Sequence, residues 1–335
     1  MLHIVTWWDK HQVALYLAAI FFGGVFGVLA PAAAPVLTAA TNPVLAVLLF
    51  ATFLAVPLIE VGRSFKHVRF LGTVLVVNFL FVPLVVFGLS RFVVDDQGLL
   101  IGVLLVLLTP CVDYVIVFTG LAGGAKARLL AATPLLMLLQ ILLLPPYLLL
   151  FGDGEAVQHI EVAPFVEAFV VIIVIPLVAA AIVQAVARRH RAGHTIEQVM
   201  AAAMVPLMML TLAVVIGSQI AAVGGQAVAL LRVVPLYVAF LVVMLFVGLG
   251  ASRVARLDVP ETRAVIFSGA TRNSLVVLPL ALALPAELAI APLAVVTQTL
   301  VELVGMVLYV RLVPRLAPLP TCQMPATRPS ESELE

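Results

Sequence analysis

Apolar residues in this chain run on for about 20 positions at a time, with short polar stretches between the runs. A helix that crosses a bilayer needs roughly 20 mostly apolar residues, so each run predicts a membrane span. Ten runs meet this length. The expected spans are 13–34, 43–62, 68–90, 98–122, 128–150, 164–187, 198–221, 228–251, 263–284 and 288–312.

The order of the runs predicts an all-α integral membrane protein built from two halves. A half of five spans ends on the opposite side of the membrane from its start, so a second half with the same fold is inverted. The expected divisions are a cytoplasmic amino-terminal segment at 1–12, a first five-helix repeat at 13–150, an extracytoplasmic loop at 151–163, a second five-helix repeat at 164–312, and a disordered cytoplasmic tail at 313–335.

Composition supports lipid as the solvent. Of the 335 residues, 64% are hydrophobic and 10% are charged, whereas soluble domains carry about 25% charge. The mean hydropathy is +1.24. The two cysteines, Cys111 and Cys322, make no disulfide framework, and without CxxC or histidine-rich spacing we expect no resident metal and no cofactor.

The positive charges predict the orientation. With ten spans, all 18 Lys and Arg residues except Arg91, Arg232 and Arg272 fall on one side of the membrane. Loops on the cytoplasmic side carry an excess of Lys and Arg. We therefore expect a multi-pass protein of the cell membrane with both termini in the cytoplasm.

Two spans carry polar interruptions at equivalent positions in the two halves. The fourth span of the first half contains Thr109, Pro110, Cys111 and Asp113, and that of the second half contains SGATRNS at 268–274. Pro110 removes a backbone donor, and Gly269 gives the second helix similar freedom. Irregular backbone at this depth is tolerated only where it is buried in protein or lines a cavity. Helices 4 and 9 are therefore expected to be discontinuous and to cross at the midplane.

The interruptions also place charges near the bilayer centre, where an unpaired Arg costs at least ~2.5–3.5 kcal/mol. We expect Arg272 to pair with Asp113, and Glu302 on the last span is a second candidate. The predicted substrate-binding residues are Thr109, Cys111, Arg272, Asn273 and Ser274. A packing role for Cys111 and a purely structural ion pair are the simpler alternatives.

Two stretches resemble a known family. PCVDYVIVFTGLAGG followed by TPLLMLLQ resembles the fourth and fifth helices of arsenical-resistance permeases, the arsenite-efflux branch of the bile acid/sodium symporter superfamily. FSGATRNSLVVLPLAL resembles the ninth helix of that superfamily, whose fold is two inverted five-helix repeats. The resemblance covers about residues 13–312.

The family pattern carries over in part. Cys111 stands at the cysteine of the arsenite branch, which makes it the expected ligand of a transported metalloid, and Asn273 stands at the superfamily asparagine. The important Glu of that branch is replaced by Leu275. Ser268 and Arg272 occupy the positions of the Glu and Gln that hold sodium in the coupled branch. A guanidinium there should repel sodium, so we expect a proton on Asp113 or Glu302 to drive transport.

These observations predict a secondary active transporter, an arsenite or antimonite efflux permease working as a proton-coupled antiporter. The alternative is an organic-anion transporter of the same fold in which Arg272 binds the anion. No HExxH lies in a span and no Ser/His pair lies at midplane depth, so we expect no enzyme. Without a nucleotide-binding loop we expect no direct use of ATP. The expected partners are the substrate and the lipid bilayer, not nucleic acid.

Overall fold

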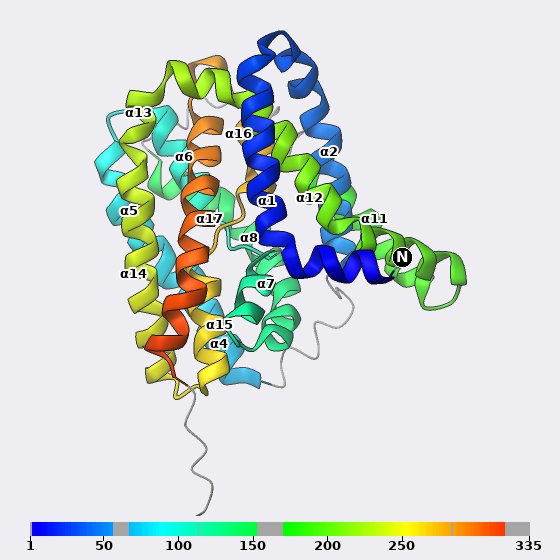
Figure 1. The fold of residues 1–335 in the computed structure, drawn as a ribbon. Helices are drawn as coiled ribbons and strands as arrows, with labels where there is room; N and C mark the ends of the chain where they lie inside the picture. Colours follow the sequence, from blue (N-terminus) through cyan, green and yellow to red (C-terminus); the bar gives the residue numbers. More distant parts are fainter. Residues whose placement is uncertain (1, 56–66, 113, 153–169, 283, 319–335) are drawn as a thin grey trace, which may run out of the picture.

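The computed structural model describes residues 2–55, 67–112, 114–152, 170–282 and 284–318, and all named elements in these ranges are helical (Figure 1). An isolated bridge joins Pro110 to Arg272. The elements are α1 (Leu2–Leu29), η1 (Pro31–Ala33), α2 (Ala34–Ala55), α4 (Val68–Val76), η4 (Val77–Phe81), α5 (Val82–Ser90), η5 (Arg91–Val93), α6 (Gln97–Leu107), α7 (Tyr114–Leu121), α8 (Lys126–Phe151), η6 (Val170–Val174), α11 (Ile175–Ala187), α12 (Arg191–Gly225), α13 (Ala227–Leu231), α14 (Val233–Val254), α15 (Val259–Ala270), α16 (Ser274–Leu282), η7 (Ala286–Leu288) and α17 (Ala291–Leu316).

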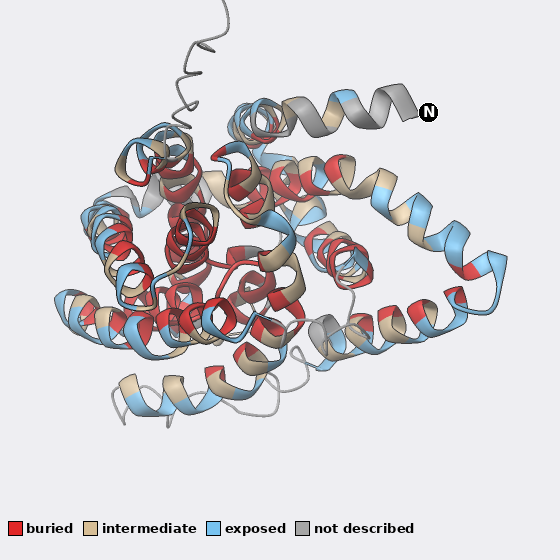
Figure 2. Cartoon of the chain, turned by 90° about the horizontal axis from the view of Figure 1, so that it is seen from below, coloured by how far each residue is buried: buried red, intermediate tan, exposed pale blue. Residues whose placement is uncertain are grey.

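The helices form two groups. In the first, α12 packs along α1 and α2, and α11 packs against α2 and α12. In the second, α14 packs on α15 and α17, and α17 also lies against α6 and α16. The elements α7, α8 and η4 belong to the second group as well, because each packs against α15. Figure 1 shows α1, α2, α11 and α12 on one side of the molecule and α5, α14 and α17 on the other. Buried residues concentrate in the second group, whereas the first ten residues of α12 are mostly exposed (Figure 2).

Six described helical segments are long and apolar enough to cross a membrane, and three shorter apolar helices accompany them. The chain is therefore a multi-pass membrane protein, and the count of ten spans stays a prediction. The ranges expected for the fourth and ninth spans each hold two shorter helices, α6 with α7 and α15 with α16. Of the expected segments, 56–62, 153–169 and 319–335 lie outside the described residues, as does Asp113.

The first boundaries differ from those expected. α1 spans Leu2–Leu29, and Figure 1 shows its amino-terminal part turned away from the rest of the helix, so the separate segment expected at 1–12 stays a prediction. The helix ends just before Pro31, which starts the short η1, and α2 begins at Ala34 rather than at residue 43. Proline is favoured at helix starts because the missing N–H is not needed there. At the interior Pro43, the α2 helix continues despite the lost bond.

A π-helical turn, η4, interrupts the helix between α4 and α5. Pro83 cannot donate to the carbonyl of Phe79 four residues earlier, which leaves that acceptor open. The Tyr147 hydroxyl of α8 donates to this carbonyl oxygen at 2.7 Å. The turn therefore persists because a neighbouring helix satisfies the freed group.

Arg263 joins helix ends at one end of the molecule. Its Nη1 donates to the carbonyl of Ala122 after α7, and its Nη2 to that of Ala317 after α17, each at 2.8 Å. Gly123, with φ +65°, turns the chain out of α7.

At an exposed site elsewhere, Arg232 donates to Asp95 at 2.8 Å and lowers the pKa of that carboxyl below its usual value.

Glycine allows α1 and α12 to approach closely. A Cβ on Gly27 would lie 2.4 Å from the carbonyl oxygen of Gly217, and one on Gly23 would lie 2.6 Å from that of Ala213. By contrast, a Cβ on Gly24 would meet its nearest neighbour, a methyl of Ile216, at 3.6 Å. The contact between the helices therefore depends on two particular glycines.

Gly27→Ala should destabilise the detergent-solubilised protein by about 1–3 kcal/mol, because the added methyl forces two helix backbones apart. Gly24→Ala is the matched control and should be neutral or slightly stabilising, since alanine favours helix more than glycine does. Thermal unfolding followed by circular dichroism measures both. Equal midpoints for the two variants would contradict the close contact.

Candidate functional site

Two extended stretches pair with each other in the middle of the second helix group. The backbone N–H of Cys111 donates to the carbonyl of Thr271 at 3.2 Å, and that of Asn273 donates to the carbonyl of Thr109 at 2.8 Å. These stretches separate α6 from α7 and α15 from α16. Each interruption therefore supplies hydrogen-bond partners for the other in a region where lipid supplies none.

Four helix ends meet at this crossing: the carboxyl ends of α6 and α15 and the amino ends of α7 and α16. Threonines satisfy carbonyls in the last turns of the first pair. The Thr109 hydroxyl lies 3.0 Å from the carbonyl oxygens of Leu105 and Val106, and that of Thr271 donates to Phe267 at 2.8 Å. Helix dipoles bring partial negative charge from α6 and α15 and partial positive charge from α7 and α16.

The Arg272 guanidinium donates hydrogen bonds to the carboxyl ends of α6 and α15, which carry the partial negative charge of the helix dipoles. Its Nη2 lies 2.7 Å from the carbonyl oxygen of Gly269, 2.8 Å from that of Ser268 and 2.9 Å from Oδ1 of Asn78. Its Nη1 donates to the carbonyl of Leu107, the last residue of α6, at 3.3 Å. The side chain is 0% exposed. The cation therefore caps two helices at once.

The charge of Arg272 is compensated by these dipoles rather than by an ion pair in the part of the chain that the structure describes. Among those residues, no carboxylate oxygen lies within 4.0 Å of the guanidinium. The ring of Phe240 lies beneath it, with its centroid 5.5 Å from the guanidinium carbon. The expected pairing of Arg272 with Asp113 stays a prediction, because Asp113 lies outside the described residues.

Glu302 of α17 joins the crossing through other atoms. Its Oε2 accepts the backbone N–H of Arg272 at 2.8 Å and also the side-chain amide of Gln298. Its Oε1 lies 2.6 Å from the hydroxyl of Tyr114, which is also 3.0 Å from the carbonyl oxygen of Arg272. A phenol has one proton, so Tyr114 can donate to only one of these acceptors at a time. Glu302 therefore links α7, the bend after α15, and α17.

Several buried polar atoms at the crossing have no hydrogen-bond partner among the residues that the structure describes. They are Nε of Arg272, Nδ2 of Asn273, Oγ of Ser274 and Oε1 of Gln298. Buried polar groups in native proteins are nearly always hydrogen-bonded to protein or water. These atoms are therefore the ones able to receive a solute or a water molecule.

A small cavity of about 110 Å³ lies beside Tyr114, between the two helix groups. The first group contributes side chains from α1, α2 and α12, and the second from α7 and α8 and the stretch before α7. The Thr52 hydroxyl is buried here and has no hydrogen-bond partner in the described part of the chain. The lining residues are Tyr16, Thr52, Ala55, Val112, Tyr114, Ile116, Val117, Leu130, Met204 and Met208.

The family model described as the sodium bile acid symporter family matches residues 42–229, more than half of the chain. This chain belongs to the sodium bile acid symporter family. Its members are transporters rather than enzymes. The matched part runs from α2 to α13 and contains the first of the two paired stretches. A search of the curated proteins gives no match.

In this symporter-family chain the crossing brings most of the predicted site residues together. Thr109, Cys111, Arg272, Asn273 and Ser274 are each at most 1% exposed. They lie in or next to the paired stretches, but none lines the small cavity. Their predicted role in substrate binding is untested by this arrangement.

Pro110 and Gly269, the two residues predicted to break their helices, differ in their positions. Pro110 lies in the paired stretch itself. Gly269 does not break its helix, because α15 continues through it to Ala270. A Cβ at Gly269 would lie 2.8 Å from a methyl of Val77. Its small size therefore serves the approach of η4 to α15.

Three residues at the crossing had no place among the predicted site residues. Asn78, in η4, donates to Oγ of Ser268 at 3.0 Å and accepts from Arg272. Tyr114 and Gln298 both contact Glu302. The available signal for Asn78 was an amide near the middle of an apolar span, and for Gln298 its spacing of four from Glu302. Tyr114 looked like one more aromatic residue of an apolar helix.

Arg272→Met should lower the free energy of unfolding by about 3 kcal/mol or more, because it leaves the carbonyls of Leu107, Ser268 and Gly269 without this donor. Arg315→Met, at an exposed end of α17, is the control and should stay within about 0.5 kcal/mol. Chemical unfolding in detergent micelles measures both. Similar losses for the two variants would show that Arg272 does not hold the helix ends.

Proposed function

We propose that the chain is a secondary transporter of ten spans in two inverted five-helix repeats, in which α6–α7 and α15–α16 are the discontinuous fourth and ninth helices. The pairing of the two interrupted stretches through backbone hydrogen bonds supports this arrangement. Inverted repeats whose broken helices meet at the membrane centre are a common design of secondary transporters.

Alternating access in this proposal is movement of the first helix group relative to the second. The cavity supports it, because its walls come from both groups. The crossing stays a rigid part of the second group, since the backbone pairing and the hydrogen bonds of Arg272 and Glu302 tie elements of that group together. Tyr114 connects the two parts, because it both lines the cavity and contacts Glu302.

The proposed substrate is a small uncharged solute that carries hydroxyl groups, with trivalent arsenic or antimony hydroxide as the favoured case and efflux as the direction. The observation that carries this proposal is the cavity itself. At about 110 Å³ it suits a small molecule, and the lining residues that the structure describes contribute hydroxyls and two thioethers and no charged side chain. Soft thioethers and thiols suit soft metalloids. Cys111 directly precedes the lining residue Val112 and supplies the thiol once the groups separate.

An organic anion is the second candidate. The amino ends of α7 and α16 meet at the crossing, where Nδ2 of Asn273 and Oγ of Ser274 lack partners among the described residues. Helix amino ends with spare donors favour an anion. Arg272 contributes little to such a site, because both its Nη atoms already donate to oxygens of the protein.

Proton coupling completes the proposal. Three oxygens, from Asn78, Ser268 and Gly269, surround one nitrogen of a permanent cation. An additional sodium ion there would meet the full repulsion of Arg272 in a low-dielectric region. Glu302 is the group that exchanges the proton, since its hydrogen bonds include a hydroxyl whose direction can reverse.

Substrate identity is tested by flux into liposomes that contain the purified protein. Arsenite uptake should exceed that of an organic-anion panel, and Met204→Leu combined with Met208→Leu should reduce it about tenfold if both thioethers contact the metalloid. Met209→Leu, on the same helix but outside the cavity, should transport normally. Taurocholate flux that survives the double substitution, with no arsenite flux in the wild type, favours the organic-anion alternative.

Coupling is tested in the same liposomes with separate gradients. A proton gradient should drive flux and a sodium gradient at fixed pH should not. Glu302→Gln should lose the response to the proton gradient, because an amide cannot exchange the proton, while Gln298→Leu should retain it. Flux that follows the sodium gradient would refute the coupling scheme.

A further inference from the structure

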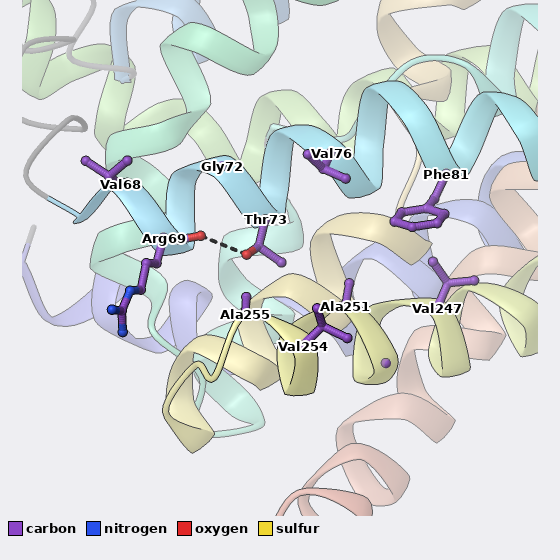
Figure 3. A pocket seen from close by; sticks show the side chains of 11 residues that line it. Val68, Arg69, Gly72, Thr73, Val76, Phe81, Val247, Ala251, Val254 and Ala255 are labelled. Carbon is purple, nitrogen blue, oxygen red and sulfur yellow. Dashed lines mark hydrogen bonds between the residues drawn. The ribbon is translucent and has the colours of Figure 1, made fainter.

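A membrane-facing groove of about 650 Å³ lies between the α4–η4 helix and α14, away from the crossing. Figure 3 shows Val68, Val76 and Phe81 on one wall and Val247 and Val254 on the other. The lining is almost wholly apolar, and its outermost valines are widely open: Val68 is 70% exposed and Val254 is 86% exposed.

Two glycines leave the groove unfilled. A Cβ built on Gly72 or on Gly250 would meet nothing within 4 Å. From Val68 to Phe81 the wall extends roughly 20 Å at the helical rise per residue. One leaflet of the hydrocarbon core is about 15 Å deep. The groove therefore has the length of one acyl chain lying along the helix axes.

The charge of the groove's described lining lies at one end. Among the described lining residues Arg69 is the charged one, and it lies at the end marked by Val68 (Figure 3). Arg253 and Arg256 flank Val254 and Ala255 at the same end, and all three arginines are exposed. Within the described ranges, no carboxylate lies within 4.0 Å of these three guanidinium groups. The other end, at Phe81 and Val247, is apolar.

From this polarity we infer that the groove binds one anionic phospholipid, with its phosphate at Arg69 and an acyl chain running toward Phe81. A phosphate at the membrane surface gains a bidentate partner in arginine, and the chain covers apolar surface that lies open in the protein. The position of Arg69 at the end of a candidate span places the guanidinium at headgroup depth. The site is separate from the proposed transport pathway.

Native mass spectrometry of the full-length, delipidated protein in detergent tests this inference. Phosphatidylglycerol should be retained about fivefold more than phosphatidylcholine, as one arginine near a lipid phosphate predicts. Arg69→Gln should remove this preference, whereas Arg315→Gln removes a similar exposed charge elsewhere and should keep it. Gly250→Leu should fill the groove and lower retention of both lipids.

Gly88→Leu is the matched control for the larger side chain, because a Cβ at Gly88 also meets nothing within 4 Å but lies outside the groove. It should bind lipid as the wild type does. Equal retention of the two lipids by the wild type, or unchanged retention in Gly250→Leu, would overturn the inference. A shift of Gly250→Leu from dimer to monomer with unchanged lipid counts would overturn it too, by assigning the groove to a second copy.

Discussion

Backbone groups released at a helix break have no water to bind inside a bilayer, and the second helix group is organised around meeting that demand. Each of the two paired stretches provides backbone hydrogen-bond partners for the other. Two threonine hydroxyls donate to carbonyls of the preceding helical turn, and Arg272 donates to carbonyls at the ends of α6 and α15. Glu302 accepts one of the remaining N–H groups. Because an unsatisfied backbone group in hydrocarbon costs several kcal/mol, these contacts decide whether the breaks can exist at all.

The same contacts explain how a permanent charge can stay fully buried inside the protein. Arg272 faces two negative helix ends and an aromatic ring, and the carboxylate of Glu302, which accepts its backbone N–H, adds an electrostatic attraction. Arg263 is used in a similar way at the ends of α7 and α17. If the guanidinium is a fixed part of the protein, the transport cycle proposed above can use Tyr114 and Glu302 for coupling and leave the crossing intact. Family membership makes the chain a transporter. The fixed charge of Arg272 is the feature for which we propose coupling to protons rather than to sodium.

The sequence predicted which two stretches meet at the crossing, but it did not predict the hydrogen bonds made there. Pro110 and the polar run at 268–274 stand out against apolar spans, so the meeting of those two stretches could be predicted from their positions. The contacts of Arg272 could not, because a charge in an apolar segment suggests an opposite charge, whereas carbonyls at helix ends leave no mark in the sequence. Gly269 was expected to loosen its helix and instead provides room for η4, since the effect of a glycine depends on what packs against it. The start of α2 was also missed, because prolines permit a helix start at more than one place.

Site-resolved hydrogen exchange of the purified protein in detergent tests the central claim, that the two interrupted stretches satisfy each other's backbone. The amides of Cys111 and Asn273 should exchange as slowly as those in the middle of α6 and α15, and both should exchange much faster in Arg272→Gln, while exchange in α1 and α12 stays unchanged. Rapid exchange of both amides in the wild-type protein would contradict the account, because it would mean that water rather than the opposite stretch satisfies the breaks.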